Sequence, residues 1–157
     1  MIRTKLGLAL VALAAAALAV PALSAAGRNT IELEAKLKGA NEVPKPGPPE
    51  AKGEIHVFAK PTKGKLCFTL EVKNLDPLIM GHIHKGAEGI SGPIKVTLFE
   101  DDQGLDGDGS YEGCVKEIKE KLLDKIVADP ESFYANIHTQ DYPDGAIRGQ
   151  LELSGEG

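Results

Sequence analysis

The chain has 157 residues, of which 42% are hydrophobic, and its net charge at pH 7 is −5. A chain of this length holds one domain with a substantial hydrophobic core. Its excess of acidic residues argues against nucleic acid and against an anionic membrane surface as partners.

The first 26 residues have the pattern of a secretory signal peptide. Arg3 and Lys5 precede the uncharged run LGLALVALAAAALAV, and the small residues of ALSAAG follow as a cleavage site. An uncleaved membrane anchor is the alternative, because a slightly longer apolar run would span a bilayer. We expect cleavage, which predicts one mature domain over residues 27–157, without a membrane span, in the periplasm or outside the cell. That segment holds two of the 18 basic residues and none of the 23 acidic ones, so the mature charge would be −7.

Most of the remaining chain has the alternation of half-buried strands. TIELEAKLKG alternates apolar and charged residues, and the Pro-rich loop NEVPKPGPPEAKG follows it. EIHVFAK and KLCFTLEV are joined by PTKG, a pattern typical of a hairpin. LIMGHIH and GPIKVTLFE flank KGAEGIS, and FYANIHT and GAIRGQLEL flank the turn QDYPDG.

One segment has a different period. In CVKEIKEKLLDKIVADP, the apolar residues Val115, Ile118, Leu122 and Ile126 recur at helical spacing, which predicts an amphipathic helix over residues 115–128. The acidic stretch before it predicts a flexible loop. The expected fold is therefore all-β, an antiparallel β-sandwich or flattened Greek-key-like barrel with one helical insertion.

The two cysteines, Cys67 and Cys114, are an even number in a chain predicted to be exported. This pattern predicts one disulfide, which would tie the segment at the entrance of the helix to the sheet. A thiolate metal ligand is the alternative.

His82 and His84 are separated by one residue in a predicted strand, so both side chains point to the same face. Their Cβ atoms should lie roughly 7 Å apart, within reach of one metal ion. Ile83 takes the core face, which places the histidines on the outer face. The same alternation sends His138 outward from FYANIHT, and if the two strands are neighbours the three imidazoles share one patch.

Three nitrogen ligands with an open position are typical of a catalytic or labile metal site. The alternative is that these histidines are solvated or hydrogen-bonded to loops. His56 also alternates outward and is either a fourth ligand or a surface histidine. Arg148 also faces outward; it is either a surface residue, or the partner of a carboxylate such as Asp141 or Asp144, or it orients a small anion beside the metal.

Three segments, LKGANEVP, GHIHKGAEGISGPIKVTL and YANIHTQDYPDGAIRGQL, occur in this order and resemble the CHRD domain, which is named from chordin. LCFTLEVKNL and GCVKEI are similar to the cysteine-bearing segments of bacterial members. The resemblance spans residues 31–153 and implies an all-β domain of an exported protein. It implies little about biochemistry, because a single copy does not carry chordin's role as an extracellular growth-factor antagonist.

The arrangement of the candidate site is also similar to the copper site of copper/zinc superoxide dismutases. By this likeness, His82 and His84 match paired copper ligands, His138 matches a later ligand and Arg148 matches an anion-guiding arginine. No histidine lies between His84 and His138, so a bridging ligand and a separate zinc site are not expected.

We therefore expect an exported protein that binds one copper ion, or alternatively zinc, with superoxide dismutation or copper handling as its activity. Superoxide or another small anion would then be its partner. A non-catalytic extracellular module without metal, in which the histidines hold the loops in shape, is the alternative from another class.

Overall fold

The computed structural model describes residues 30–155, so the predicted signal peptide lies outside the described residues. Within this range the chain forms nine strands and one α-helix. The strands are β1 (Ile31–Lys38), β2 (Lys52–Lys60), β3 (Lys65–Lys73), β4 (Leu78–Lys85), β5 (Ile94–Leu105), β6 (Gly109–Val115), β7 (Phe133–Thr139), β8 (Ile147–Gln150) and β9 (Glu152–Leu153). The helix is α1 (Glu120–Ala128), and the 3-10 turns are η1 (Gly39–Asn41), η2 (Pro61–Lys63) and η3 (Pro130–Ser132).

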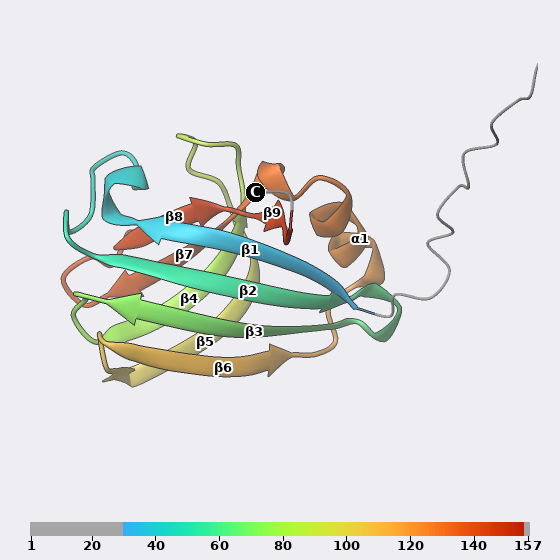
Figure 1. Cartoon of the computed structure of the whole chain (residues 1–157), viewed down its shortest axis with the longest axis horizontal. Helices are drawn as coiled ribbons and strands as arrows, with labels where there is room; N and C mark the ends of the chain where they lie inside the picture. The colour runs from blue at the N-terminus through green and yellow to red at the C-terminus, as the bar shows by residue number, and fades with distance from the viewer. Residues whose placement is uncertain (1–29, 156–157) are drawn as a thin grey trace, which may run out of the picture.

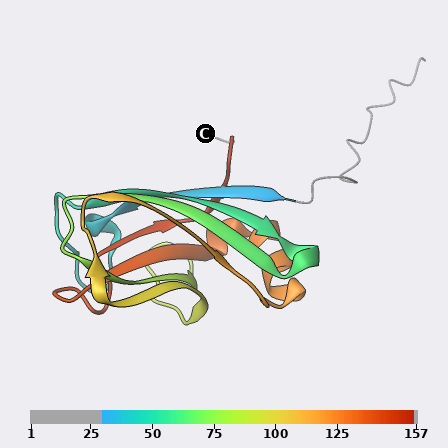
Figure 2. The same cartoon turned by 90° about the horizontal axis from the view of Figure 1, so that it is seen from below.

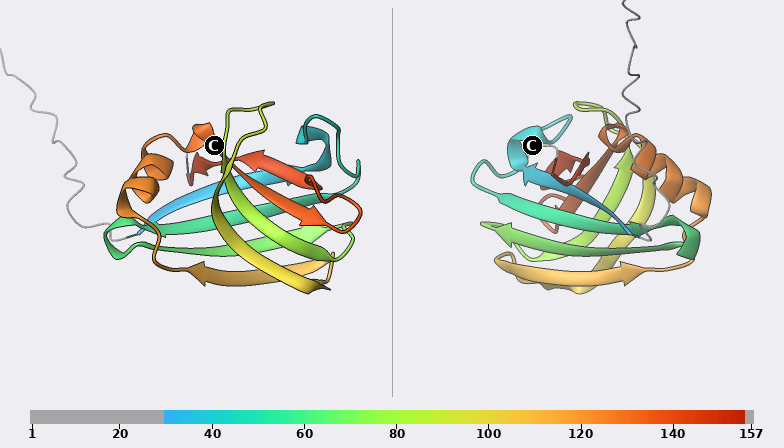
Figure 3. Two further views of the ribbon diagram at one scale, coloured as in Figure 1. Left: turned by 180° about the vertical axis from the view of Figure 1, so that it is seen from behind. Right: turned by 45° about the vertical axis from the view of Figure 1, so that its right-hand side comes forward.

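The strands form one antiparallel sheet in the order β5-β4-β7-β8-β1-β2-β3-β6, with β9 paired to β1 (Figure 1). The two strands at the ends of this order, β5 and β6, follow each other in the chain. The sheet therefore curls into a nearly closed barrel, as Figure 2 shows from below. Figure 3 shows α1 at one end of this barrel and the loop between β4 and β5 standing above its outer face. The expected all-β architecture is confirmed.

The alternation along the strands builds the core. In β1, Leu33, Ala35 and Leu37 are buried whereas the lysines between and beyond them are exposed. The helix adds Leu123 and Ile126 to the same cluster. Burial of this apolar surface is the main term that stabilises the fold. Among the described residues, no helix has the length and apolar character needed to cross a membrane.

The predicted helix is correct in type but wrong at its start. It begins at Glu120, and Val115 belongs to β6, where it pairs with Leu66 of β3. Val115 and Ile118 both pack against the core from non-helical backbone, so the apolar spacing alone did not separate them from the helical residues.

The flexible acidic loop expected before the helix is also wrong. β5 continues to Leu105 and β6 begins at Gly109, so most of this segment lies in strands. In these two strands only Val96 and Leu98 are buried, so their polar side chains remain in contact with solvent.

The predicted disulfide between Cys67 and Cys114 is confirmed. The two residues lie directly opposite each other on β3 and β6, with 4.0 Å between their Cα atoms. Cys114 therefore lies within a strand, not at the entrance of a helix. The disulfide links an edge strand to the body of the sheet.

Candidate metal centre

The three histidines of the predicted site come together on two neighbouring strands. β4 pairs with β7 so that His82 lies opposite Asn136 and His84 lies opposite Tyr134, while His138 lies opposite Met80. One ring nitrogen of each histidine lies within 4.8 Å of the corresponding atoms of the other two. The two strands that carry the histidines are therefore neighbours, as a site shared by the three imidazoles requires.

These histidines face away from the core but are not exposed. Ile83, between the paired histidines, is fully buried in the hydrophobic cluster, as the alternation predicts. The side chains of His82, His84 and His138 retain only 3%, 8% and 5% of their accessible surface. The cluster is thus closed off from bulk solvent.

Two backbone carbonyls determine which ring nitrogens are free. His84 Nδ1 lies 2.9 Å from Gly92 O, and His138 Nδ1 lies 2.9 Å from Pro143 O. Since a carbonyl oxygen only accepts, both Nδ1 atoms carry the proton and both Nε2 atoms have a free lone pair. Histidines that bind metals usually donate their other ring N–H in this way.

Of these two Nε2 atoms, that of His138 has a hydrogen-bond partner and that of His84 has none. His138 Nε2 lies 3.1 Å from His82 Nδ1, which must donate because His138 Nε2 has only its lone pair to offer. His84 Nε2 is buried and has no hydrogen-bond partner. A buried nitrogen without a partner is rare, because it loses its hydration without compensation. A metal ion between the three rings would satisfy it.

Burial keeps the imidazoles neutral. It lowers the pKa of His82 to about 4, assisted by the neighbouring His138 and His84. Burial also lowers the pKa of His84, although the hydrogen bond to Gly92 opposes the shift, and that of His138, where the bond to Pro143 opposes it. At neutral pH the three rings are therefore in the deprotonated form that binds metals.

Tyr134 and Gly92 support His84. The Tyr134 ring stacks on the imidazole with 4.8 Å between centroids, and its hydroxyl accepts a hydrogen bond from Gly92 N–H at 3.1 Å. Gly92 thus donates to Tyr134 and accepts from His84. A Cβ at Gly92 would lie 1.7 Å from Lys85 O, so this close approach requires glycine.

Arg148 lies beside this group but is almost fully buried, with 2% of its surface exposed. Its guanidinium carbon lies 3.6 Å from the centre of the Tyr134 ring, and Nη2 donates to Ile90 O at 3.1 Å. A longer contact of 3.5 Å reaches Ala87 O. Arg148 therefore holds the loop between β4 and β5; guidance of an anion by the same residue stays a prediction. The polar groups that surround Arg148 are these carbonyls, Gln150 and Glu42, in place of the expected Asp141 or Asp144.

Glu42 and Asn136 are two further buried polar residues near Arg148, and the sequence patterns predicted no role for either. Glu42 is 4% exposed, and burial raises its pKa to about 7 even though Arg148 and a hydrogen bond with the Asn136 side chain lower it. One oxygen of each side chain is buried without a partner. Glu42 follows η1 in a Pro-rich loop, where no periodicity indicates burial.

His56 does not join the cluster. It lies on β2, where its ring nitrogens are 3.5 to 3.7 Å from carboxylate oxygens of Glu32, Glu34 and Glu54. The candidate fourth ligand is therefore excluded from the three-histidine group, because β1 and β8 separate β2 from β7. His56 does face outward, as the strand alternation predicts. Two residues can both face outward from a curled sheet and still lie far apart.

Residues 33–151 match the sequence pattern of the CHRD domain over most of the chain's length. The chain belongs to the CHRD family. The matched region of this CHRD protein contains the three histidines, Arg148 and both cysteines. No curated protein matches the chain.

Proposed function

We propose that this CHRD protein is exported and binds one copper ion through His82, His84 and His138. The observation that carries the proposal is the group of three buried, neutral imidazoles with ring nitrogens within 4.8 Å of one another. Support for export comes from the disulfide, since disulfides persist in oxidising compartments. The family and the apolar N-terminal segment agree with export.

Copper is favoured over zinc by the donor set. Imidazole nitrogens suit both ions, and a site of given nitrogen ligands binds Cu²⁺ more tightly than Zn²⁺. Zinc is the alternative, because three histidines with an open fourth position also form catalytic zinc sites.

Two activities would follow from bound copper, namely superoxide dismutation and copper handling. Copper supplies one-electron chemistry by cycling between two oxidation states. The chain itself supplies neutral, buried ligands and the buried positive charge of Arg148 next to His84, which lowers the pKa of that histidine. This charge would attract a small anion through its field.

A non-catalytic extracellular module is the second candidate, and a specific observation favours it. His84 and His138 already hydrogen-bond to Gly92 O and Pro143 O without a metal. In this alternative the histidines hold two loops in shape, and their replacement changes stability but no metal affinity.

Metal analysis of the mature protein, purified without a metal-chelating tag, tests the proposal. We expect about one equivalent of copper in the wild type, loss of most of it in His82→Ala/His84→Ala, and normal content in the control His56→Ala. Failure of the wild type to bind added copper or zinc, or retention of metal by the double variant, would contradict the site and favour the module. A superoxide assay on copper-loaded protein then separates the two proposed activities.

A further inference from the structure

Three lysines form a row across the outer face of the sheet, on strands that carry none of the three histidines. In the strand register Lys38 of β1 lies opposite Lys52 of β2, and Lys52 lies opposite Lys73 of β3. All three side chains are exposed. Adjacent strands are about 4.8 Å apart, so the row is roughly 10 Å long at the level of the backbone.

This row is unfavourable for the folded protein by itself. Like charges directly opposite each other on neighbouring strands are destabilising. Within residues 30–155, the contacts of 4.0 Å or less between basic side-chain nitrogens and carboxylate oxygens are those of His56 with its three glutamates. None of the three lysines is therefore neutralised at that distance.

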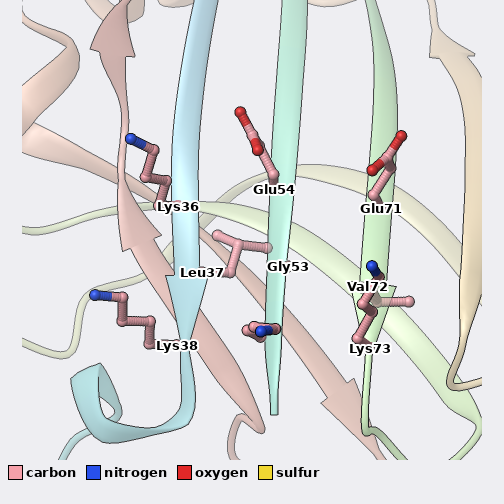
Figure 4. A pocket seen from close by; sticks show the side chains of 9 residues that line it. Lys36, Leu37, Lys38, Gly53, Glu54, Glu71, Val72 and Lys73 are labelled. Atoms are coloured by element: carbon pink, nitrogen blue, oxygen red, sulfur yellow. The ribbon is translucent and has the colours of Figure 1, made fainter. Parts of the chain in front are cut away.

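The row also borders a groove. Lys38, Lys52 and Lys73 line it together with Lys36, and its floor is the backbone around the buried residues Leu37 and Val72 and around Gly53. The groove has a volume of about 280 Å³. Figure 4 shows Lys36 and Lys38 along β1 and Lys73 on β3, with Glu54 and Glu71 further along β2 and β3. The row of three lysines thus lines one side of a short groove, and Lys36, Glu54 and Glu71, which lie opposite one another in the register, line the other side.

We propose that this groove binds an anionic polysaccharide that carries sulfate or carboxylate groups. Ammonium groups at the spacing of the strands match a chain with repeated anionic groups. A protein that binds a nucleic-acid backbone needs a longer basic stripe and a basic domain. Here Glu54 and Glu71 end the patch, and the chain has a net charge of −5.

A binding assay with dextran sulfate tests this proposal, with uncharged dextran as the matched ligand. The variant Lys38→Gln/Lys52→Gln/Lys73→Gln removes the row. The control Lys119→Gln/Lys121→Gln/Lys125→Gln removes the same charge from exposed lysines in and beside α1. We expect the wild type and the control to bind dextran sulfate, with affinity that falls as salt rises, because exposed charges are screened. The row variant should bind at least about tenfold more weakly, and neutral dextran should not bind.

Folding of the row variant is checked by its melting temperature, which should equal or exceed that of the wild type because the repulsion is relieved. Four results would overturn the proposal: no binding by the wild type, equal loss in both triple variants, tighter binding of duplex DNA than of dextran sulfate, or equally effective competition by inorganic sulfate at the same sulfate concentration. The copper content of the row variant should stay at the wild-type value, so this test is independent of the histidine site.

Discussion

At the scale of single residues, burial determines the protonation of the side chains around the candidate centre. The pKa of His82 is lowered to about 4, whereas that of Glu42 is raised to about 7. Both groups are therefore driven toward their neutral forms, as desolvation requires. The consequences for stability have opposite signs.

Between pH 4 and 6.5 the unfolded chain binds a proton at His82 that the folded chain does not, so this histidine makes the protein less stable as pH falls. Between pH 4.5 and 7 the folded chain binds a proton at Glu42 that the unfolded chain does not, so Glu42 makes it less stable as pH rises. Each shift corresponds to roughly 3 kcal/mol. The two contributions partly cancel.

We expect the variant Glu42→Gln to show the contribution of the histidines to the pH dependence of stability without the opposing contribution of Glu42. The metal-free variant should lose about 2–3 kcal/mol more unfolding free energy than the wild type when the pH falls from 7 to 4.5, because the opposing carboxyl is gone. Urea unfolding at both pH values measures this loss. The exposed Glu112→Gln serves as control, and equal losses in all three proteins would contradict the assignment of the Glu42 pKa.

At the scale of elements, the loop between β4 and β5 positions His84. Gly92 O accepts its Nδ1–H, and further contacts hold the loop on β7 and β8. Arg148 donates to Ile90 O, and Gln150 Nε2 donates to Gly86 O at 2.9 Å. A ligand held through a loop is only as well placed as that loop, so these contacts preorganise the site.

Arg148→Lys separates the two roles of this side chain. Lysine keeps the positive charge but loses the planar contact with Tyr134 and the fixed geometry of the guanidinium donors. We expect faster amide hydrogen exchange in the loop 86–92, a loss of roughly 1–3 kcal/mol in stability and about tenfold weaker copper binding. Unchanged loop protection and affinity, with an activity that depends only on the charge, would instead support anion guidance.

At the scale of the whole molecule, the disulfide secures the end of a nearly closed sheet. β6 pairs with β3, and the disulfide joins residues 47 positions apart in the chain. Cross-links of this separation destabilise the unfolded chain by restricting its conformations. The pair lies on β3 and β6, whereas the histidines lie on β4 and β7.

Cys67→Ala/Cys114→Ala should therefore weaken the fold without affecting the site. We expect the unfolding free energy to fall by about 2–4 kcal/mol and the metal content of the folded protein to be unchanged. Denaturant unfolding and elemental analysis measure the two quantities. An unchanged unfolding midpoint would show that the pairing of β3 with β6 needs no cross-link.

The strand pattern predicted which residues face outward, because side chains alternate strictly along a strand. Ile83 and Ile137 are in the core, and the histidines beside them face the other way, as expected. The apolar pattern did not separate the end of β6 from the start of α1. Val115 fits a helical period and a strand equally well, and the pairing of β6 with β3 decided between them.

The sequence by itself determined the fold class, the family, the facing of the histidines and the pairing partner of each cysteine, because these depend on local alternation or on a choice among few residues. The tertiary structure alone decided that β4 adjoins β7, that His56 is remote, and that Glu42 and Arg148 are buried beside the site. Strand order and burial depend on contacts between segments far apart in the chain, and no local period encodes them.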